Sequence, residues 1–220
     1  MLVAIEGIDG AGKHTQSALL VERARAHGLS VALVSYPRYG RGVFAAAIEA
    51  LLAGELGRAN DPRLVGLLFA GDRLEGRAAL LEAMASCDLV VADRYVASNL
   101  AYQAARAAGE RRAAIVEFLA RVEFDVFGLP RPDLNVLLDL PLDLALARLS
   151  ARASGDRPAE DHYESDHRFL AACAAAYAAM AEGKDWAVVA AAGPEGPRCP
   201  EAVAGAVWEA VAAHRALREA

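Results

Sequence analysis

The stretch that ends at Thr15 constrains the fold of this chain more than any other. Residues 2–6, Leu-Val-Ala-Ile-Glu, are mostly apolar and partly β-branched, which is typical of a buried parallel strand. They lead into Gly7-Ile-Asp-Gly-Ala-Gly-Lys13, which keeps the G-x-x-x-x-G-K spacing of a phosphate-binding loop. Glycines let backbone amides turn inward, the helix that follows points its positive end at the same place, and Lys13 adds a charge. An ordinary glycine-rich strand–helix turn is the alternative, but the strand, the helix and the lysine together favour the phosphate loop.

One residue departs from this pattern. The pattern places Ser or Thr after the lysine, because that hydroxyl ligates Mg²⁺, whereas this chain has His14. An imidazole is a poor ligand for a hard ion that prefers oxygen, and the hydroxyl of Thr15 lies about 100° further around the helix. The sequence therefore predicts an intact phosphate cradle with an unusual metal site. The residues predicted to bind the ATP phosphates are Gly7, Asp9, Gly10, Ala11, Gly12, Lys13, His14 and Thr15.

The rest of the chain repeats the strand–helix alternation. Apolar strands are expected at 29–36, 88–93, 134–140 and 186–192. Helical patterns lie between them, one of them at 108–127, and a Gly/Pro-rich loop is expected at 193–200. This alternation predicts an α/β fold: a five-stranded, parallel, doubly wound sheet with helices on both faces, in a single domain over 1–220. Ligands bind at the carboxyl ends of the strands in such a sheet. Residues 153–161 are rich in helix breakers, so a mobile lid is expected at about 148–162.

Composition excludes several classes of protein. An apolar fraction of 55% with 24% charged residues is that of a soluble globular protein, and no apolar run reaches the ~18 residues of a membrane span. Glu6 and Asp9 interrupt any signal-peptide core. The net charge of −6 argues against binding to nucleic-acid backbones. Three cysteines without metal or redox spacing predict reduced thiols and a cytoplasmic location.

Five stretches in register carry a resemblance to a known family. Residues 93–103, Asp-Arg-Tyr-Val-Ala-Ser-Asn-Leu-Ala-Tyr-Gln, resemble the signature of thymidylate kinases, which phosphorylate dTMP to dTDP with ATP. Residues 6–13, 36–39, 69–73 and 132–139 agree with the same family in order and spacing, and only the C-terminal fifth is unmarked. The resemblance implies a P-loop NTPase fold of the nucleoside monophosphate kinase type and Mg²⁺ with ATP as the phosphoryl donor. It also implies a cytoplasmic homodimer, without nucleic-acid or membrane partners.

The resemblance further implies a pocket for the thymine base. Phe69 stacks on the base, Arg73 donates to O4, which favours a carbonyl over the amino group of cytosine, and Asn99 bonds the ring N3–H. Tyr102 crowds the 2′ position of the sugar and so favours deoxyribose. Taken singly, such residues are more often core, cap or surface positions, so it is their joint spacing that favours a site.

The same family comparison assigns the phosphate end of the acceptor site. Arg38 and Arg94 grip the acceptor phosphate, for which guanidinium geometry is well suited, and Asp9 contacts the 3′-OH side of the sugar and the metal region. The complete set implied for dTMP is Asp9, Tyr36, Arg38, Tyr39, Phe69, Arg73, Arg94, Asn99 and Tyr102.

The catalytic cation is expected from the lid. Some thymidylate kinases carry an extra cation in the phosphate loop and others in the lid, and Ala11 occupies the loop position here. The first choice is Arg152 and the second Arg148, while Arg157 is less well aligned. The predicted catalytic set is therefore Lys13, Arg94, Arg152, Arg148 and Asp9, and the candidate metal ligands are Asp9, Glu164 and Asp93.

Three other functions agree with parts of this pattern. A kinase of the same fold could act on another nucleoside monophosphate or on a deoxynucleoside. A phosphate-loop switch would lack the acceptor-site residues, and the chain carries no recognisable guanine-specificity motif. A non-catalytic nucleotide-binding paralogue is suggested only by His14.

Overall fold

A central parallel sheet organises the computed structural model, which describes residues 1–57, 61–153 and 167–219. Its strand order is β2-β3-β1-β4-β5, and every pairing is parallel. The strands are β1 (Leu2–Glu6), β2 (Val31–Ser35), β3 (Leu89–Asp93), β4 (Leu134–Asp139) and β5 (Trp186–Ala190). The phosphate-loop strand β1 thus lies at the centre of the sheet, as expected of a strand in which every residue is apolar or buried.

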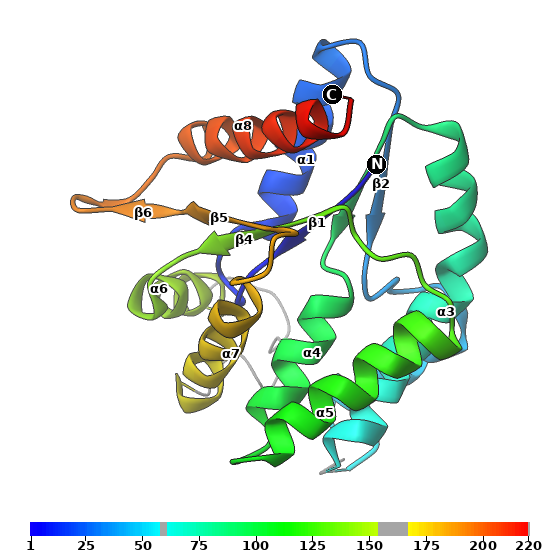
Figure 1. Ribbon diagram of the computed structural model, residues 1–220. Helices are drawn as coiled ribbons and strands as arrows, with labels where there is room; N and C mark the ends of the chain where they lie inside the picture. The colour runs from blue at the N-terminus through cyan, green and yellow to red at the C-terminus, as the bar shows by residue number, and fades with distance from the viewer. Residues whose placement is uncertain (58–60, 154–166, 220) are drawn as a thin grey trace.

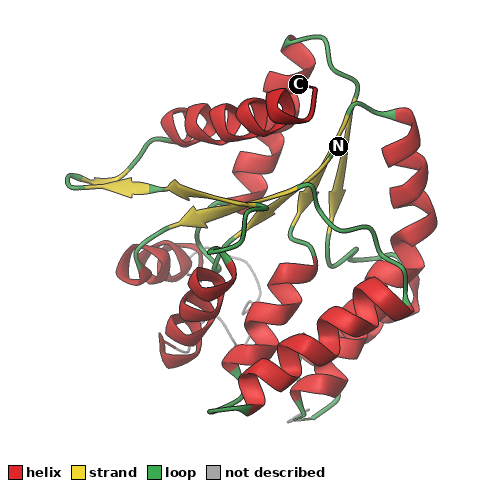
Figure 2. Ribbon diagram, in the orientation of Figure 1, coloured by secondary structure: helices red, strands yellow, loops and turns green. Residues whose placement is uncertain are grey.

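Helices cover both faces of this sheet (Figures 1 and 2). On one face α1 (Lys13–Ala26) packs against α8 (Pro200–Glu219). The other face carries α3 (Pro62–Ser86), α4 (Val96–Ala105), α5 (Arg111–Ala120), α6 (Leu142–Ala153) and α7 (His167–Met180), and α2 (Gly42–Leu52) packs on α3. The predicted doubly wound α/β fold is confirmed.

The alternation of β1 explains the two-sided core. Val3 and Ile5 belong to the apolar cluster that contains Leu20 of α1, whereas Leu2 and Ala4 belong to the cluster that contains Leu80 of α3. Successive side chains of a strand point to opposite faces, so one strand serves both layers. No helix among the described residues is long and apolar enough to cross a membrane.

Two predicted boundaries are wrong. The helix expected at 108–127 begins at Arg111, and its last part is a π-helical turn, η1 (Arg121–Val126). The loop expected at 193–200 contains a short antiparallel hairpin of β6 (Ala192–Gly193) and β7 (Gly196–Pro197). The hairpin contributes no residue to the cavity described below, whereas Glu123 of η1 contacts two of the residues that line it.

The carboxyl ends of β1, β2 and β3 meet at one edge of the sheet, and the chain turns sharply after each. After β3, Arg94 takes a left-handed conformation with φ 63°. This costs a non-glycine residue about 1–3 kcal/mol, so its surroundings must hold it. Tyr95 follows as the N-cap of α4, and Arg94 forms an ion pair with Asp9 in the loop after β1.

Candidate active site

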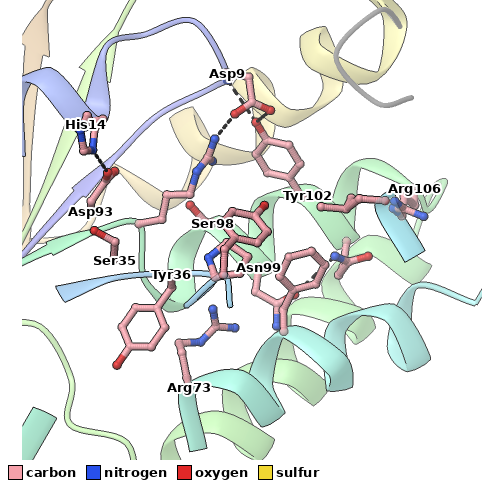
Figure 3. Close-up of a pocket in the computed structure, with 16 residues that line it drawn as sticks. Asp9, His14, Ser35, Tyr36, Arg73, Asp93, Ser98, Asn99, Tyr102 and Arg106 are labelled. Carbon is pink, nitrogen blue, oxygen red and sulfur yellow. Dashed lines mark hydrogen bonds and ion pairs between the residues drawn. The ribbon is translucent and has the colours of Figure 1, made fainter. Parts of the chain in front are cut away.

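A cavity of about 420 Å³ opens at this edge of the sheet (Figure 3). It brings together ten of the residues predicted from the sequence: Asp9, His14, Tyr36, Tyr39, Phe69, Arg73, Asp93, Arg94, Asn99 and Tyr102. Six further residues line it: Ser35, Pro37, Leu52, Ser98, Gln103 and Arg106. One pocket therefore receives side chains from the phosphate loop and from α3 and α4.

The backbone of the phosphate loop depends on glycine. Gly7, Gly10 and Gly12 have φ values of 142°, 84° and 97°, a region that L side chains rarely adopt. A Cβ at Gly10 would also lie 2.7 Å from the carbonyl oxygen of Ala145, so any side chain there would collide with α6. The three glycines thus permit the close packing of the loop against the helix that follows β4.

Lys13 folds back over the loop that it ends. Its ammonium group donates to the carbonyl oxygens of Gly7 at 2.9 Å and Ile8 at 2.8 Å, and it lies 3.7 Å from Asp9 Oδ1. The lysine is 6% exposed. A buried ammonium at the start of α1 concentrates positive charge where phosphate oxygens would lie.

Asp9 joins the phosphate loop to α4. It forms an ion pair with Arg94, and its Oδ2 accepts a hydrogen bond of 2.6 Å from the Tyr102 hydroxyl. That hydroxyl also accepts a hydrogen bond of 3.1 Å from the backbone N–H of Asp9. Burial raises the pKa of Tyr102, so the phenol keeps its proton and remains a donor. The structure thus shows a partner for the Tyr102 hydroxyl that the sequence did not reveal.

His14 lies beside Asp93. The distance from its Nδ1 to Asp93 Oδ2 is 3.2 Å, and the imidazole is largely exposed at the mouth of the cavity. The residue that replaces the usual Ser or Thr therefore contacts one of the candidate metal ligands.

The base-reading residues predicted on α3 and α4 share a buried partner. Arg73 donates to Glu123 through Nε at 2.5 Å and through Nη2 at 2.7 Å, and Asn99 Nδ2 donates to Glu123 Oε1 at 2.8 Å. Glu123 lies in η1 and was not among the predicted residues. One signal pointed to it: with Ile115 and Leu119 it forms an i, i+4, i+8 series on the buried side of the helix.

Arg38 is the predicted acceptor-site residue that does not line the cavity. Its backbone N–H donates to Asp72 Oδ2 at 2.9 Å, its Nε to Asp72 Oδ1 at 3.0 Å, and its Nη2 to Glu75 at 3.1 Å. The loop after β2 is thereby tied to α3. The Arg38 guanidinium therefore lies against two carboxylates of α3 and outside the lining of the cavity.

The lid contributes one described contact. Arg148 of α6 donates through Nη1 to the carbonyl oxygen of Gly10 at 3.1 Å, which places a guanidinium against the phosphate loop. Arg152 lies one turn further along α6, and its side chain falls outside the described part of the chain. Arg157, Glu164 and most of the predicted lid also lie outside it. In the loop itself Ala11 is buried and Thr15 is exposed.

Comparison with known proteins assigns the chain to a family. The family described as thymidylate kinase matches residues 5–197. The chain belongs to the thymidylate kinase family. It is 41% identical to a thymidylate kinase of Mycobacterium tuberculosis strain H37Rv over 196 residues, which cover 87% of this chain and 92% of the relative. It is 36% identical to one of Thermomicrobium roseum over 210 residues, which cover 95% and 93% of the two chains.

Thymidylate kinases use ATP, and ATP-dependent kinases generally need a divalent metal. No group of three or more His, Cys, Asp or Glu residues that could hold a metal is found in the described ranges. Asp9 and Asp93 nevertheless line the same cavity. Mg²⁺ commonly keeps several waters and takes only one or two carboxylates beside the substrate phosphates, so these two residues fit such an ion.

A second buried carboxylate supports the turn at Arg94. Glu6 is fully buried and accepts hydrogen bonds from the Tyr95 N–H at 2.8 Å, the Ser98 hydroxyl at 2.6 Å and the Tyr177 hydroxyl at 3.0 Å. Burial raises the pKa of Glu6, although these hydrogen bonds and Arg94 oppose the shift. The last residue of β1 thus holds the start of α4 through these hydrogen bonds.

Gln103 was also missed as a site residue. It lies one turn beyond Asn99 on α4, is 2% exposed and lines the cavity. Its Nε2 is 3.4 Å from Asn99 Oδ1, and its Oε1 has no hydrogen-bond partner among the described residues. A buried carbonyl oxygen without a partner costs about 1–3 kcal/mol, which is typical of a site that a ligand or water completes.

Proposed function

We infer that the chain transfers the γ-phosphoryl group of ATP to dTMP and yields dTDP and ADP. The observation that carries this inference is that donor and acceptor residues open onto one cavity. Asp9 and His14 of the phosphate loop line it together with Arg73 and Asn99 from α3 and α4. A switch protein needs only the first pair, whereas a phosphotransferase needs both.

We propose the roles of the acceptor-site residues from the family resemblance. Phe69 stacks on the thymine, Arg73 donates to O4 and Asn99 accepts from N3–H. The cavity lining and the burial of Arg73 and Asn99 at 2% and 3% exposed support these roles, because desolvated polar groups discriminate strongly between bases. The Tyr102 ring limits space at the 2′ position, and Arg94 and Arg38 hold the acceptor phosphate.

Catalysis then requires positioning and charge neutralisation. The acceptor phosphate is already an anion at neutral pH, so no strong general base is needed. Lys13 and the loop amides hold the ATP phosphates, and Arg148 and Arg152 neutralise the charge that develops during transfer. An arginine in this role can contribute about 10³–10⁵ in rate. Asp9, Asp93 and Glu164 are the residues that would hold Mg²⁺, which would supply neutralisation of the phosphate charge.

A cytoplasmic homodimer remains a proposal from the family resemblance. The exposed apolar side chains of Val43 on α2 and Leu64 on α3, at 76% and 63% exposed, support an interface on these helices. Light scattering after size-exclusion chromatography tests it: a monomeric mass at micromolar concentration would contradict the dimer.

Product analysis tests the reaction. The chain is incubated with ATP, Mg²⁺ and, in turn, dTMP, dUMP, CMP, AMP and thymidine, and the nucleotides are separated by chromatography. We expect one dTDP for each ADP formed. Comparable rates with CMP or AMP would contradict the thymine pocket. ADP and inorganic phosphate without dTDP would indicate a switch, and nucleotide binding without turnover would indicate a non-catalytic paralogue.

A further inference from the structure

Glu123 holds both base-reading side chains at once. Its carboxylate accepts two hydrogen bonds from Arg73 and one from Asn99, and it is completely buried. The sequence separates Glu123 from Arg73 by 50 residues and from Asn99 by 24. A single carboxylate therefore connects α3, α4 and η1 directly beneath the cavity.

Close packing brings Glu123 to this place. A Cβ at Gly66 of α3 would lie 2.6 Å from a methyl carbon of Leu119, so the glycine allows α5 to approach α3 closely. Beyond Leu119 the helix widens into η1, in which the Phe127 N–H donates to the carbonyl oxygen of Val122 at 2.8 Å. π-helical turns of this kind occur frequently at functional sites.

We propose that Glu123 is a positioning residue that makes the pocket select a 4-keto pyrimidine over a 4-amino pyrimidine. This inference rests on the proposed function. The two hydrogens of Asn99 Nδ2 are donated to Glu123 Oε1 and to the carbonyl oxygen of Gly66 at 2.9 Å. The amide is thereby fixed with Oδ1 as its acceptor. This oxygen lies 3.4 Å from Gln103 Nε2 and has a second lone pair with which to accept from a ligand.

Glu123 also fixes the Arg73 guanidinium, but here the group left for a ligand is a donor. Its Nε and Nη2 are bound to Glu123, which leaves Nη1 without a hydrogen bond to any described residue, and Arg73 lines the cavity. At Asn99 and Arg73 the pocket therefore presents one acceptor and one donor. The N3–H and O4 of thymine match this pair, whereas cytosine offers an acceptor at N3 and a donor at N4.

A purely structural role for Glu123 makes a different prediction. Removing one partner of a buried ion pair is destabilising in any case. Loss of stability alone should lower turnover of all nucleotides alike, because it reduces the amount of folded enzyme. Loss of positioning should instead change the ratio of kcat/KM for dTMP to that for dCMP.

Glu123→Gln is the sharpest variant, because it keeps the volume and replaces one acceptor by a donor. Whichever way the new amide lies, it places an N–H against an N–H of Arg73. We expect the dTMP:dCMP ratio of kcat/KM to fall about tenfold or more, since one misplaced hydrogen bond to a base edge carries about that factor. Glu123→Asp keeps the charge and both acceptor oxygens but withdraws them by one methylene group, so its ratio should lie between those of Glu123→Gln and the wild type.

Val207→Ala is the matched control. Val207 of α8 is fully buried on the opposite face of the sheet, so its truncation should lower Tm and leave the ratio unchanged. An unchanged ratio in folded Glu123→Gln, or in Glu123→Asp if Glu123→Gln does not fold, refutes the positioning role. A wild-type protein that does not phosphorylate dTMP would refute the proposed function instead, so the two failures are distinguishable.

Discussion

The Tyr102 hydroxyl offers a quantitative test of how the two halves of the site are joined. Tyr102→Phe removes the hydrogen bond to the Asp9 carboxylate at 2.6 Å and the one from the Asp9 N–H at 3.1 Å. A bond to a charged group contributes about 1.5–3 kcal/mol and a neutral one about 0.5–1.5, so the pair contributes about 2–4.5 kcal/mol. Asp9 borders the cavity, where water can replace part of the loss, and we expect the lower end of this range.

The same change separates two roles of the residue. Without the hydroxyl, the Asp9 carboxylate should no longer hold Arg94 in one place. The value of kcat/KM for dTMP should then fall about tenfold for each 1.4 kcal/mol of transition-state stabilisation that is lost. The aromatic ring remains, so the preference for dTMP over ribothymidine 5′-monophosphate should not change. Denaturant unfolding gives the stability, and initial rates with both nucleotides give the kinetics.

Tyr95→Phe is the control for this experiment. The Tyr95 hydroxyl donates to the carbonyl oxygen of Pro130 at 3.0 Å, and Tyr95 does not line the cavity. Its loss should cost about 1 kcal/mol of stability without a kinetic effect. Wild-type stability and kcat/KM in Tyr102→Phe would refute the link between Asp9 and α4. A collapse of the deoxyribose preference would show that the hydroxyl, and not the ring, rejects the 2′-OH.

Three further predictions follow from single side chains. Because burial raises the pKa of Glu6 above its ordinary 4.5, the folded state holds this proton more tightly than the unfolded state, and wild-type stability should fall as pH rises through and above 4.5. Glu6→Gln should flatten that part of a pH series of unfolding curves. Gln103→Met removes the unpartnered buried oxygen, so the Tm of the free protein should rise. The KM for dTMP should rise as well, because the same oxygen is lost as a contact for the ligand. A lower KM would contradict that contact. His14→Thr should leave Mg²⁺-dependent turnover intact or improved, because it adds an oxygen ligand and frees Asp93; a large loss of activity in a metal titration would show that His14 has a positive role.

Local patterns in the chain predict the fold well for a physical reason. A parallel strand covered on both faces must be apolar throughout, so β1, β3 and β4 are visible as runs in the sequence. The site residues follow these strands directly, at the edge where the fold collects ligands. Asp9, Arg94 and Asn99 could therefore be placed in one site before their contacts were known.

The partners of these residues could not be predicted in the same way. Glu123 and Glu6 are charged residues whose burial depends on groups far away in the sequence, and no local pattern reports such a partner. The hydrogen bond from Arg38 to Asp72 likewise joins two residues that are 34 positions apart in the sequence. The π-helical turn was missed because a helical hydrophobic pattern continues through it.

Competition between two nucleotides shows whether this cavity distinguishes thymine from cytosine. The wild-type chain receives ATP, Mg²⁺ and equal concentrations of dTMP and dCMP in one reaction, so that the ratio of the diphosphates formed equals the ratio of the two kcat/KM values. A pocket with Asn99 as the acceptor and Arg73 as the donor should form dTDP at least about 10²-fold faster than dCDP. Comparable amounts of dCDP would contradict the assignment of this cavity as a thymine site.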